Sequence, residues 1–354
     1  MMTHPPPYPT VGRDKSGPYG CLYERIILML RLPPFRYLAP GTIEQATQML
    51  AQEGERAMLV AGGTDLYPNM KRRQFTPPVL IGLRGIAALK DISGSPEQGM
   101  RVGAGVTLTT LANHPAFIEH YAALATASGS VSTPQLRNMG TIGGNLLLDT
   151  RCNYYNQTEF WRHSIDYCMK KDGEICLVAP GSPRCWAISS ADTAPVLVSL
   201  DAYVRLVNVR GERVLPVREL FRDDGINPYT RSNDEILSEI ILPPADGWRS
   251  VYLKLRRRGS FDFPILGVAV ALRFAGDGTV ADARITLGAV ASHPVEATEA
   301  VKLMLGQHLT PELISEVATL AAKRSKPLDN ADLTINYRKQ VTPVYIRRAL
   351  ASFV

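Results

Sequence analysis

Residues 61–66 read AGGTDL and residues 137–145 read RNMGTIGGN, and these two glycine-rich stretches decide how the chain folds. The first follows an apolar run at 57–61 that is typical of a strand. A helix is expected at 66–72 and another strand at 79–82. Strand, helix and strand in such a short stretch predict an α/β lobe at the start of the chain.

Both stretches contain a glycine pair suited to phosphate. Glycine lets the backbone approach an anion closely, and consecutive N–H groups in such turns form an anion-binding nest. Neither is a Walker loop or a G-x-G-x-x-G fingerprint, so an ATPase or a Rossmann dehydrogenase is not expected. Taken singly, each pair is a weak signal, because most such glycine pairs only close a loop. The candidate binding residues are Ala61, Gly62, Gly63, Thr64, Asp65 and Leu66, with Thr141, Ile142, Gly143, Gly144 and Asn145.

Four cysteines follow the second stretch, at Cys152, Cys168, Cys176 and Cys185, in the pattern C-x15-C-x7-C-x8-C. Four clustered thiolates are the usual ligand set of an iron-sulfur cluster. Structural zinc is a weaker alternative because close C-x2-C pairs are missing. Disulfides are a third alternative, disfavoured because the chain start has no signal-peptide layout. The fifth cysteine, Cys21, is expected to be a bystander.

The rest of the chain divides into two patterns. Before the cysteines we expect a strand in FRYLAP, a helix from Thr42 to Gln52 with a capping box, a strand at RVGAG, and helices on both sides of His114–Pro115, the second at 116–128. A hairpin with Arg210–Gly211 at its turn comes after them. Beyond Pro243–Pro244 the pattern indicates a separate α+β domain, with strands at 251–256, 265–274 and 280–290 and helices at 295–305, 311–323 and 337–351.

Composition and charge narrow the class of protein. The chain has 354 residues, of which 45% are hydrophobic and 20% charged, as in ordinary globular proteins. The apolar run at 26–32 falls short of a membrane span, and we expect no membrane segment. The net charge of +6 is spread along the chain, so the basic run at 253–258 is not taken as a nucleic-acid site. Residues 1–31 are expected to be a disordered tail, and the cytoplasm is the expected location.

Taken together, the motifs resemble the FAD-binding medium subunits of the xanthine dehydrogenase and carbon monoxide dehydrogenase family of molybdenum hydroxylases. The resemblance begins at about Leu32. It implies an α+β fold, with a two-lobed α/β FAD-binding domain at 32–245 and a small C-terminal α+β domain at 246–354. Its anchors are the two glycine motifs, SSAD ending at Asp192, the spaced Lys254, Arg258 and Asp262, and the late stretch ARITLGAVASHPVEATEA.

The resemblance also implies roles for individual residues. The two glycine motifs would line the diphosphate and ribityl chain of FAD. Asp192 and Lys254 would sit at the flavin, and Ile236 matches an aliphatic flavin contact. No catalytic residue is expected in this chain, since the substrate would react on a partner subunit.

The cysteine segment looks like an insertion at about 148–190, similar to that of the aryl-CoA reductases within the family. By this resemblance Cys152, Cys168, Cys176 and Cys185 bind a [4Fe-4S] cluster. Trp161 and Trp186 could shield the cluster, and His163 is expected in a solvated loop. The implied partners are a molybdenum-cofactor large subunit and a [2Fe-2S] small subunit in a dimer of heterotrimers, with ferredoxin as the electron donor.

Overall fold

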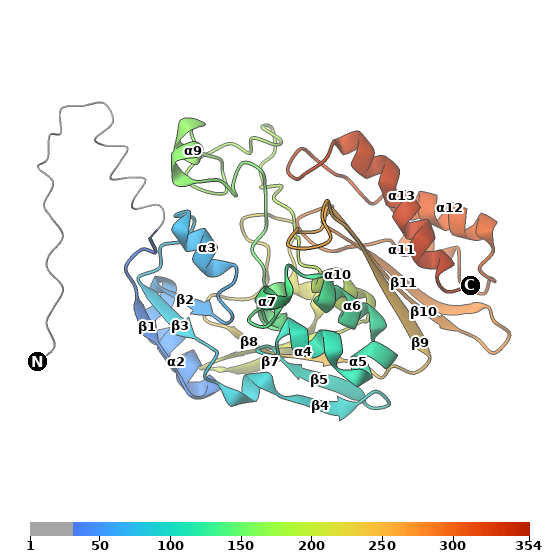
Figure 1. Ribbon diagram of the computed structural model, residues 1–354, viewed down its shortest axis with the longest axis horizontal. Coiled ribbons are helices and arrows are strands. Elements are labelled where there is room, and N and C mark those ends of the chain that lie inside the picture. Colours follow the sequence, from blue (N-terminus) through green and yellow to red (C-terminus); the bar gives the residue numbers. More distant parts are fainter. Residues whose placement is uncertain (1–30) are drawn as a thin grey trace, which may run out of the picture.

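The computed structural model describes residues 31–354 as three sheets with helices packed around them (Figure 1). The predicted tail, apart from Arg31, and Cys21 lie outside the described residues. The observed architecture confirms the α+β class and the two lobes followed by a C-terminal antiparallel sheet. Within residues 31–354 no helix is both long and apolar enough to span a membrane.

The first lobe is built on a parallel sheet of order β1-β3-β2. Its strands are β1 (Arg36–Leu38), β2 (Ala57–Val60) and β3 (Val79–Gly82), with helices α2 (Ile43–Glu53) and α3 (Leu66–Lys71). The capping box is confirmed at the start of α2. The hydroxyl of Thr42 accepts from the amide of Gln45, whose side chain accepts from Gly41 at 2.8 Å.

The second lobe is an antiparallel sheet of order β4-β5-β8-β6-β7. Its strands are β4 (Ile92–Ser95), β5 (Gly99–Gly103), β6 (Tyr203–Asn208), β7 (Gly211–Pro216) and β8 (Ile236–Leu242). Short helices cover the sheet, and most of them share one core with it. They are α4 (Leu108–Asn113), α5 (Pro115–His120), α6 (Ala122–Ser130), α7 (Pro134–Arg137), α8 (Ile142–Leu146) and α10 (Thr193–Ser199).

The C-terminal domain is an antiparallel sheet of order β12-β11-β10-β9 with three helices. Its elements are β9 (Trp248–Leu255), β10 (Leu266–Phe274), β11 (Val280–Gly288), β12 (Val295–Glu296), α11 (Thr298–Lys302), α12 (Pro311–Ala322) and α13 (Ile335–Ala351). Helix α10 is fully buried between the two antiparallel sheets, and Pro195 packs closely against Gly288. The two domains therefore share a packed interface.

Several predicted boundaries were wrong. The helix expected at 116–128 breaks at Tyr121, whose backbone leaves the helical region while its hydroxyl donates to Pro243 O at 2.8 Å. Residues 295–296 pair with β11 as strand β12, so the helix expected at 295–305 is only α11. The hairpin turn is Val209–Arg210, because Asn208 pairs with Gly211. The second glycine stretch, expected to be a turn, ends in helix α8.

The cysteine segment forms loops around one short helix, α9 (Glu159–Ser164), and stands above the sheets in Figure 1. It is held from both sides. The side chain of Gln74, just after α3, donates to Tyr155 O at 2.9 Å. On the other side the amide of Asn153 donates to Asn330 O at 3.0 Å, and the side chain of Asn330 donates to Trp186 O at 2.6 Å.

The buried strands of the C-terminal domain give a test of the core. Leu287 in β11 is fully buried in the cluster that joins the sheet to its helices. We expect Leu287→Ala to lower the free energy of unfolding by about 2–5 kcal/mol, through lost burial and the cavity left behind. Chemical denaturation measures this, with Leu305→Ala as control because Leu305 is 43% exposed. Equal effects of the two substitutions would contradict the assigned core.

Candidate functional site

The two glycine motifs are in direct contact. A Cβ atom on Gly62 would lie 2.0 Å from the carbonyl oxygen of Met139 and 3.1 Å from the amide nitrogen of Gly140. No side chain fits between two backbones that approach so closely. Two stretches more than seventy residues apart in sequence therefore form one surface of backbone.

The first motif links strand β2 to helix α3. Gly63 has a φ of 70°, a conformation that favours glycine, and the ring of Tyr67 lies against its Cα. Asp65 precedes α3, and its carboxylate accepts from Asn69 at 2.9 Å and from Arg151. Burial raises the pKa of Asp65 and lowers the pKa of Arg151. The attraction between the two charges shifts each pKa in the opposite direction, but by less.

The second motif starts helix α8. The hydroxyl of Thr141 accepts from the amide of Gly144 at 3.1 Å, as an N-cap does. Gly143 is packed against Ala104, whereas Gly144 is exposed and a Cβ there would meet only its own cap. Of the two paired glycines, Gly144 is thus the one with backbone accessible to a ligand.

Asp192 and Lys254 form a buried ion pair. Lys254 Nζ lies 2.9 Å from Asp192 Oδ2, and Tyr252 donates its hydroxyl to Asp192 Oδ1 at 2.8 Å. The side chains of Asp192 and Lys254 are 3% and 4% exposed. Burial raises the pKa of Asp192 and lowers that of Lys254, and each is opposed by the charge of the other. Lys254 also donates to Ser130 O at 3.1 Å, so the pair connects β9 to the end of α6.

The ion pair does not include the other residues that the resemblance names, Ile236, Arg258 and Asp262. Ile236 is 1% exposed and packs among the core residues of the first lobe, such as Ile81 and Leu89. Arg258 and Asp262 form an ion pair at the surface, with Arg258 70% exposed. The flavin roles of all these residues stay predictions.

The four insertion cysteines come together in one buried pocket. Cys152, Cys168, Cys176 and Cys185 are 8%, 7%, 5% and 4% exposed, and none forms a disulfide. Burial, reinforced by the nearby thiols of Cys168 and Cys185, raises the pKa of Cys152 to about 12. Burial likewise raises the pKa of Cys185 to about 11, with Cys176 and Cys168 adding to it. The loops thus bring the four thiols close enough to interact electrostatically.

The four thiols are not arranged as a site for a single metal ion, and the cluster stays a prediction. Four thiolates sharing one tetrahedral zinc would stand about 3.8 Å apart. Among residues 31–354 no group of three or more Cys, His, Asp or Glu side chains is placed to hold a metal ion. A four-iron cluster is larger, so its thiolates stand further apart. Backbone amides also point at the sulfurs, including Ala187 N, which is 3.4 Å from Cys185 Sγ.

The sequence did not reveal the charged residues around this pocket. Arg151, directly before Cys152, pairs with Asp65 of the first glycine motif and lies over the ring of Phe263. Lys170 pairs with Asp149 at 2.8 Å, and both belong to the inserted segment. The position of Arg151 beside a cysteine was the only available signal, because its partner is 86 residues away.

The aromatic residues expected around the cysteines are arranged differently. Tyr154, Tyr155 and Met169 pack with the thiols. Trp186 instead lies beneath the guanidinium of Arg184, 3.6 Å from it. His163 is exposed as expected, but it lies in helix α9 rather than in a loop.

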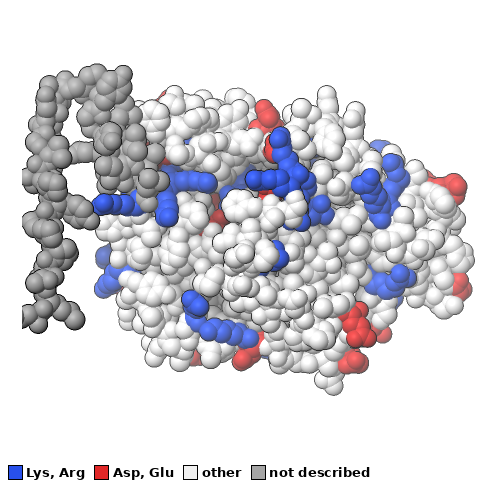
Figure 2. Space-filling view, in the orientation of Figure 1, with Lys and Arg blue, Asp and Glu red and all other residues white. Residues whose placement is uncertain are grey.

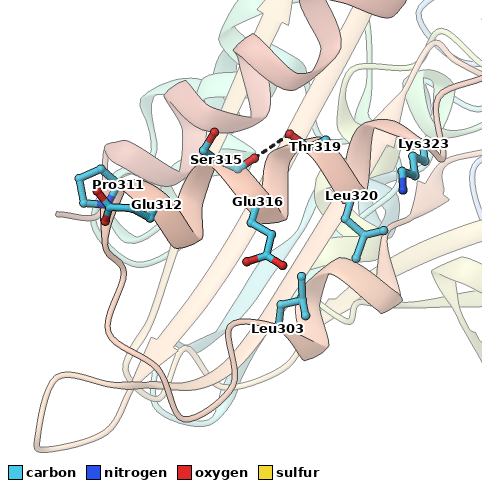
Figure 3. A pocket seen from close by; sticks show the side chains of 8 residues that line it. All are labelled: Leu303, Pro311, Glu312, Ser315, Glu316, Thr319, Leu320 and Lys323. Carbon is cyan, nitrogen blue, oxygen red and sulfur yellow. Dashed lines mark hydrogen bonds between the residues drawn. The ribbon is translucent and has the colours of Figure 1, made fainter.

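One surface groove lies away from the cysteines and glycine motifs, and another borders the second glycine motif. A groove of about 710 Å³ runs along helix α12 beside α11, where Glu312, Glu316 and Lys323 line it (Figure 3). It has no thiol and no glycine motif, so it offers no redox chemistry. Another groove, of about 460 Å³, borders the second glycine motif at Arg137 and Asn138. Figure 2 shows Lys and Arg in separate groups over one face of the molecule rather than in a continuous basic track.

Comparison with known proteins identifies the class. Residues 33–245 match the family described as FAD binding domain in molybdopterin dehydrogenase, and residues 250–353 match the CO dehydrogenase flavoprotein C-terminal domain. The chain therefore belongs to the FAD-binding medium subunits of the molybdenum hydroxylase family. It is a subunit of a multi-subunit oxidoreductase.

Individual relatives agree with this assignment. The nicotine 6-hydroxylase medium subunit of Paenarthrobacter nicotinovorans is 28% identical over 91% of this chain and 98% of that protein. The aldehyde oxidoreductase FAD-binding subunit PaoB of Escherichia coli is 32% identical over 75% of this chain and 85% of that protein. Among solved structures, a carbon monoxide dehydrogenase from Hydrogenophaga pseudoflava superposes with a TM-score of 0.73 at 27% identity, over 91% of this chain and 97% of that chain.

The contact between the glycine motifs predicts a sensitive position. In Gly62→Ala the added methyl group must push the Met139 backbone away, so we expect unfolding to become easier by about 1–3 kcal/mol and FAD to bind more weakly. Thermal unfolding and flavin content per chain measure both. Gly181→Ala is the control, because a Cβ there meets no atom within 4 Å. Full flavin content in Gly62→Ala would show that the contact is not needed.

The buried ion pair predicts a difference between two carboxylates. Asp192→Asn leaves the Lys254 ammonium buried without its counter-charge, which should cost about 3–5 kcal/mol of folding stability. Asp262→Asn removes the surface partner of Arg258 and should have little effect. Denaturant unfolding of both variants tests this. Similar stabilities would mean that the attraction between Asp192 and Lys254 does not exceed the free energy needed to remove both charges from water.

Proposed function

We propose that this chain is the electron-transferring β subunit of a 4-hydroxybenzoyl-CoA reductase and holds both FAD and a [4Fe-4S] cluster. The observation that carries the proposal is the buried set of four unpaired thiols in a loop that contacts the first glycine motif. A flavin exchanges one or two electrons and so matches one-electron clusters to two-electron chemistry.

The flavin would be held by the joined glycine motifs. Ala61 to Leu66 and Thr141 to Asn145 supply the backbone for the diphosphate and ribityl chain. Asp192 and Lys254 would line the part of the flavin site near α10. Ile236 would contact the flavin from the core of the first lobe. The half-buried state of the first motif and the exposed Gly144 support this arrangement.

The cluster would be bound by Cys152, Cys168, Cys176 and Cys185. The thiols are inaccessible to bulk solvent, and neighbouring amides can donate to their sulfurs. Both features are expected where hydrogen bonds and burial set the reduction potential of a cluster. The raised pKa values of Cys152 and Cys185 mean that assembly must displace their protons.

The proposed partners are a molybdenum-cofactor large subunit and a [2Fe-2S] small subunit, as a dimer of heterotrimers. Reduced ferredoxin is the proposed donor. In the overall reaction 4-hydroxybenzoyl-CoA takes up two electrons and two protons and yields benzoyl-CoA and water. The reaction belongs to the molybdenum subunit, and the part of this chain is to hold its redox groups in place.

A second candidate is a molybdenum hydroxylase that oxidises another aromatic, heterocyclic or acyl-CoA substrate. The similarity to subunits of a nicotine 6-hydroxylase and an aldehyde oxidoreductase favours it. Formation of benzoyl-CoA by the purified complex with reduced ferredoxin separates the two candidates. Absence of that product, together with oxidation of an aldehyde or a heterocycle, would favour the second one.

The thiol pocket predicts the metal content of the purified protein. Anaerobically prepared wild-type protein should contain about four irons and four acid-labile sulfides per chain. Cys168→Ser or Cys176→Ser should lose most of both, because a cluster deprived of one thiolate assembles poorly. Cys21→Ser is the matched control and should keep them. One zinc and no sulfide in the wild type would instead indicate a zinc-stabilised module.

A further inference from the structure

Lys170 is a buried cation in the middle of the cysteine segment. Its side chain is only 6% exposed. The ammonium donates to three oxygens, Asp149 Oδ1 at 2.8 Å, Thr150 Oγ1 at 2.9 Å and Gly225 O at 2.7 Å. A lysine ammonium has three N–H donors and no acceptor, so all its hydrogen bonds are made. Its position is therefore fixed by the surrounding oxygens.

Lys170 is joined to Cys185 through Gly225. The amide of Gly225 donates to Cys185 O at 3.0 Å, and a Cβ on Gly225 would lie 2.8 Å from Cys185 Sγ. Lys170 holds the carbonyl of the same glycine. The Lys170 ammonium and the sulfur of Cys185 thus lie on the two sides of one residue, Gly225.

Charges alternate from the first glycine motif to the thiols. Asp65 pairs with Arg151, and Arg151 also lies within electrostatic reach of Asp149. Asp149 pairs with Lys170, which lies beside Cys185. The row begins at the proposed flavin site and ends at the proposed cluster ligands.

A four-thiolate iron-sulfur cluster is negatively charged in both oxidation states, and reduction adds another negative charge. A fixed cation nearby stabilises the reduced form more than the oxidised form, and a fixed anion does the opposite. The cation here is buried, so solvent screens it little. We propose that Lys170 is a positioning residue that raises the reduction potential of the cluster, and that Asp149 opposes it. The inference rests on the proposed function.

Two other cations close to the cysteines in sequence are more exposed or point to other partners. Lys171 is adjacent in sequence, but its side chain is 34% exposed and pairs with Asp172. Arg184 precedes Cys185, but its guanidinium turns to Asp223 and the ring of Trp186. Lys170 thus combines a buried charge with a direct link, through Gly225, to Cys185.

The experiment uses the purified holoprotein and follows the cluster by electron paramagnetic resonance during redox titration. At a fixed poise Lys170→Met should lower the ratio of reduced to oxidised cluster roughly ten-fold, which is about 59 mV for one electron. Asp149→Asn should raise that ratio, and Lys170→Arg should stay near the wild type. Lys171→Met is the matched control and should change the ratio less than three-fold.

If Lys170→Met and Asp149→Asn change the ratio of reduced to oxidised cluster in opposite directions, Lys170 acts through its charge. A merely structural role would not give opposite changes for the two members of one ion pair. Equal ratios in wild type and Lys170→Met, or shifts of the same sign in Lys170→Met and Asp149→Asn, would overturn the inference while leaving the cluster in place. If Lys170→Met assembles no cluster, the sign of the Asp149→Asn shift decides. A wild-type protein without iron and sulfide would overturn the proposed function and this inference together.

Discussion

The close backbone contact at Gly62 is the constraint on which the rest of the site depends. Because Met139 and Gly140 lie directly against Gly62, the loop after β2 and the loop before α8 cannot move independently. The first belongs to the parallel sheet and the second to the antiparallel lobe. One contact without side chains thus fixes the geometry of the two lobes at the surface proposed to bind the flavin.

The cysteine segment is attached to that surface at its beginning. Arg151 stands one residue before the first cysteine, pairs with Asp65, and exchanges backbone hydrogen bonds with Ile188 at the end of the segment. Closing a loop of nearly forty residues in this way removes part of its conformational freedom before its thiols are ordered. Its further anchors at Gln74 and Asn330 tie it to the first lobe and to the C-terminal domain.

Local signals predicted most of the fold and part of the site. The capping box at Thr42, the strand at 79–82 and Pro311 at the start of α12 depend on neighbouring residues, and each lies where it was expected. The break at Tyr121 and strand β12 depend on partners distant in sequence, so periodicity could not show them.

In the candidate site too, the sequence revealed residues of distinctive type but not residues whose role depends on distant partners. The glycine pairs and clustered cysteines were visible in sequence because their residue types are distinctive. Lys170 was not, because lysine is usually a surface residue and its acceptor Gly225 is 55 residues away.

In the inserted segment, the burial of individual charged residues matters more for the electrostatics than the net charge does. Residues 148–190 contain as many Lys and Arg as Asp and Glu, namely Arg151, Arg162, Lys170, Lys171 and Arg184 against Asp149, Glu159, Asp166, Asp172 and Glu174. Such a segment has no net charge with which to attract a partner. Two of its cations are nevertheless buried, with the side chains of Arg162 and Lys170 at 1% and 6% exposure. Burying a cation is costly unless a counter-charge is near. Arg162 pairs with Glu159 and also donates to Arg72 O at 3.0 Å, and Lys170 pairs with Asp149. For Lys170, the proposed cluster on the neighbouring thiolates would add to the compensation from Asp149, in an interior that solvent does not reach.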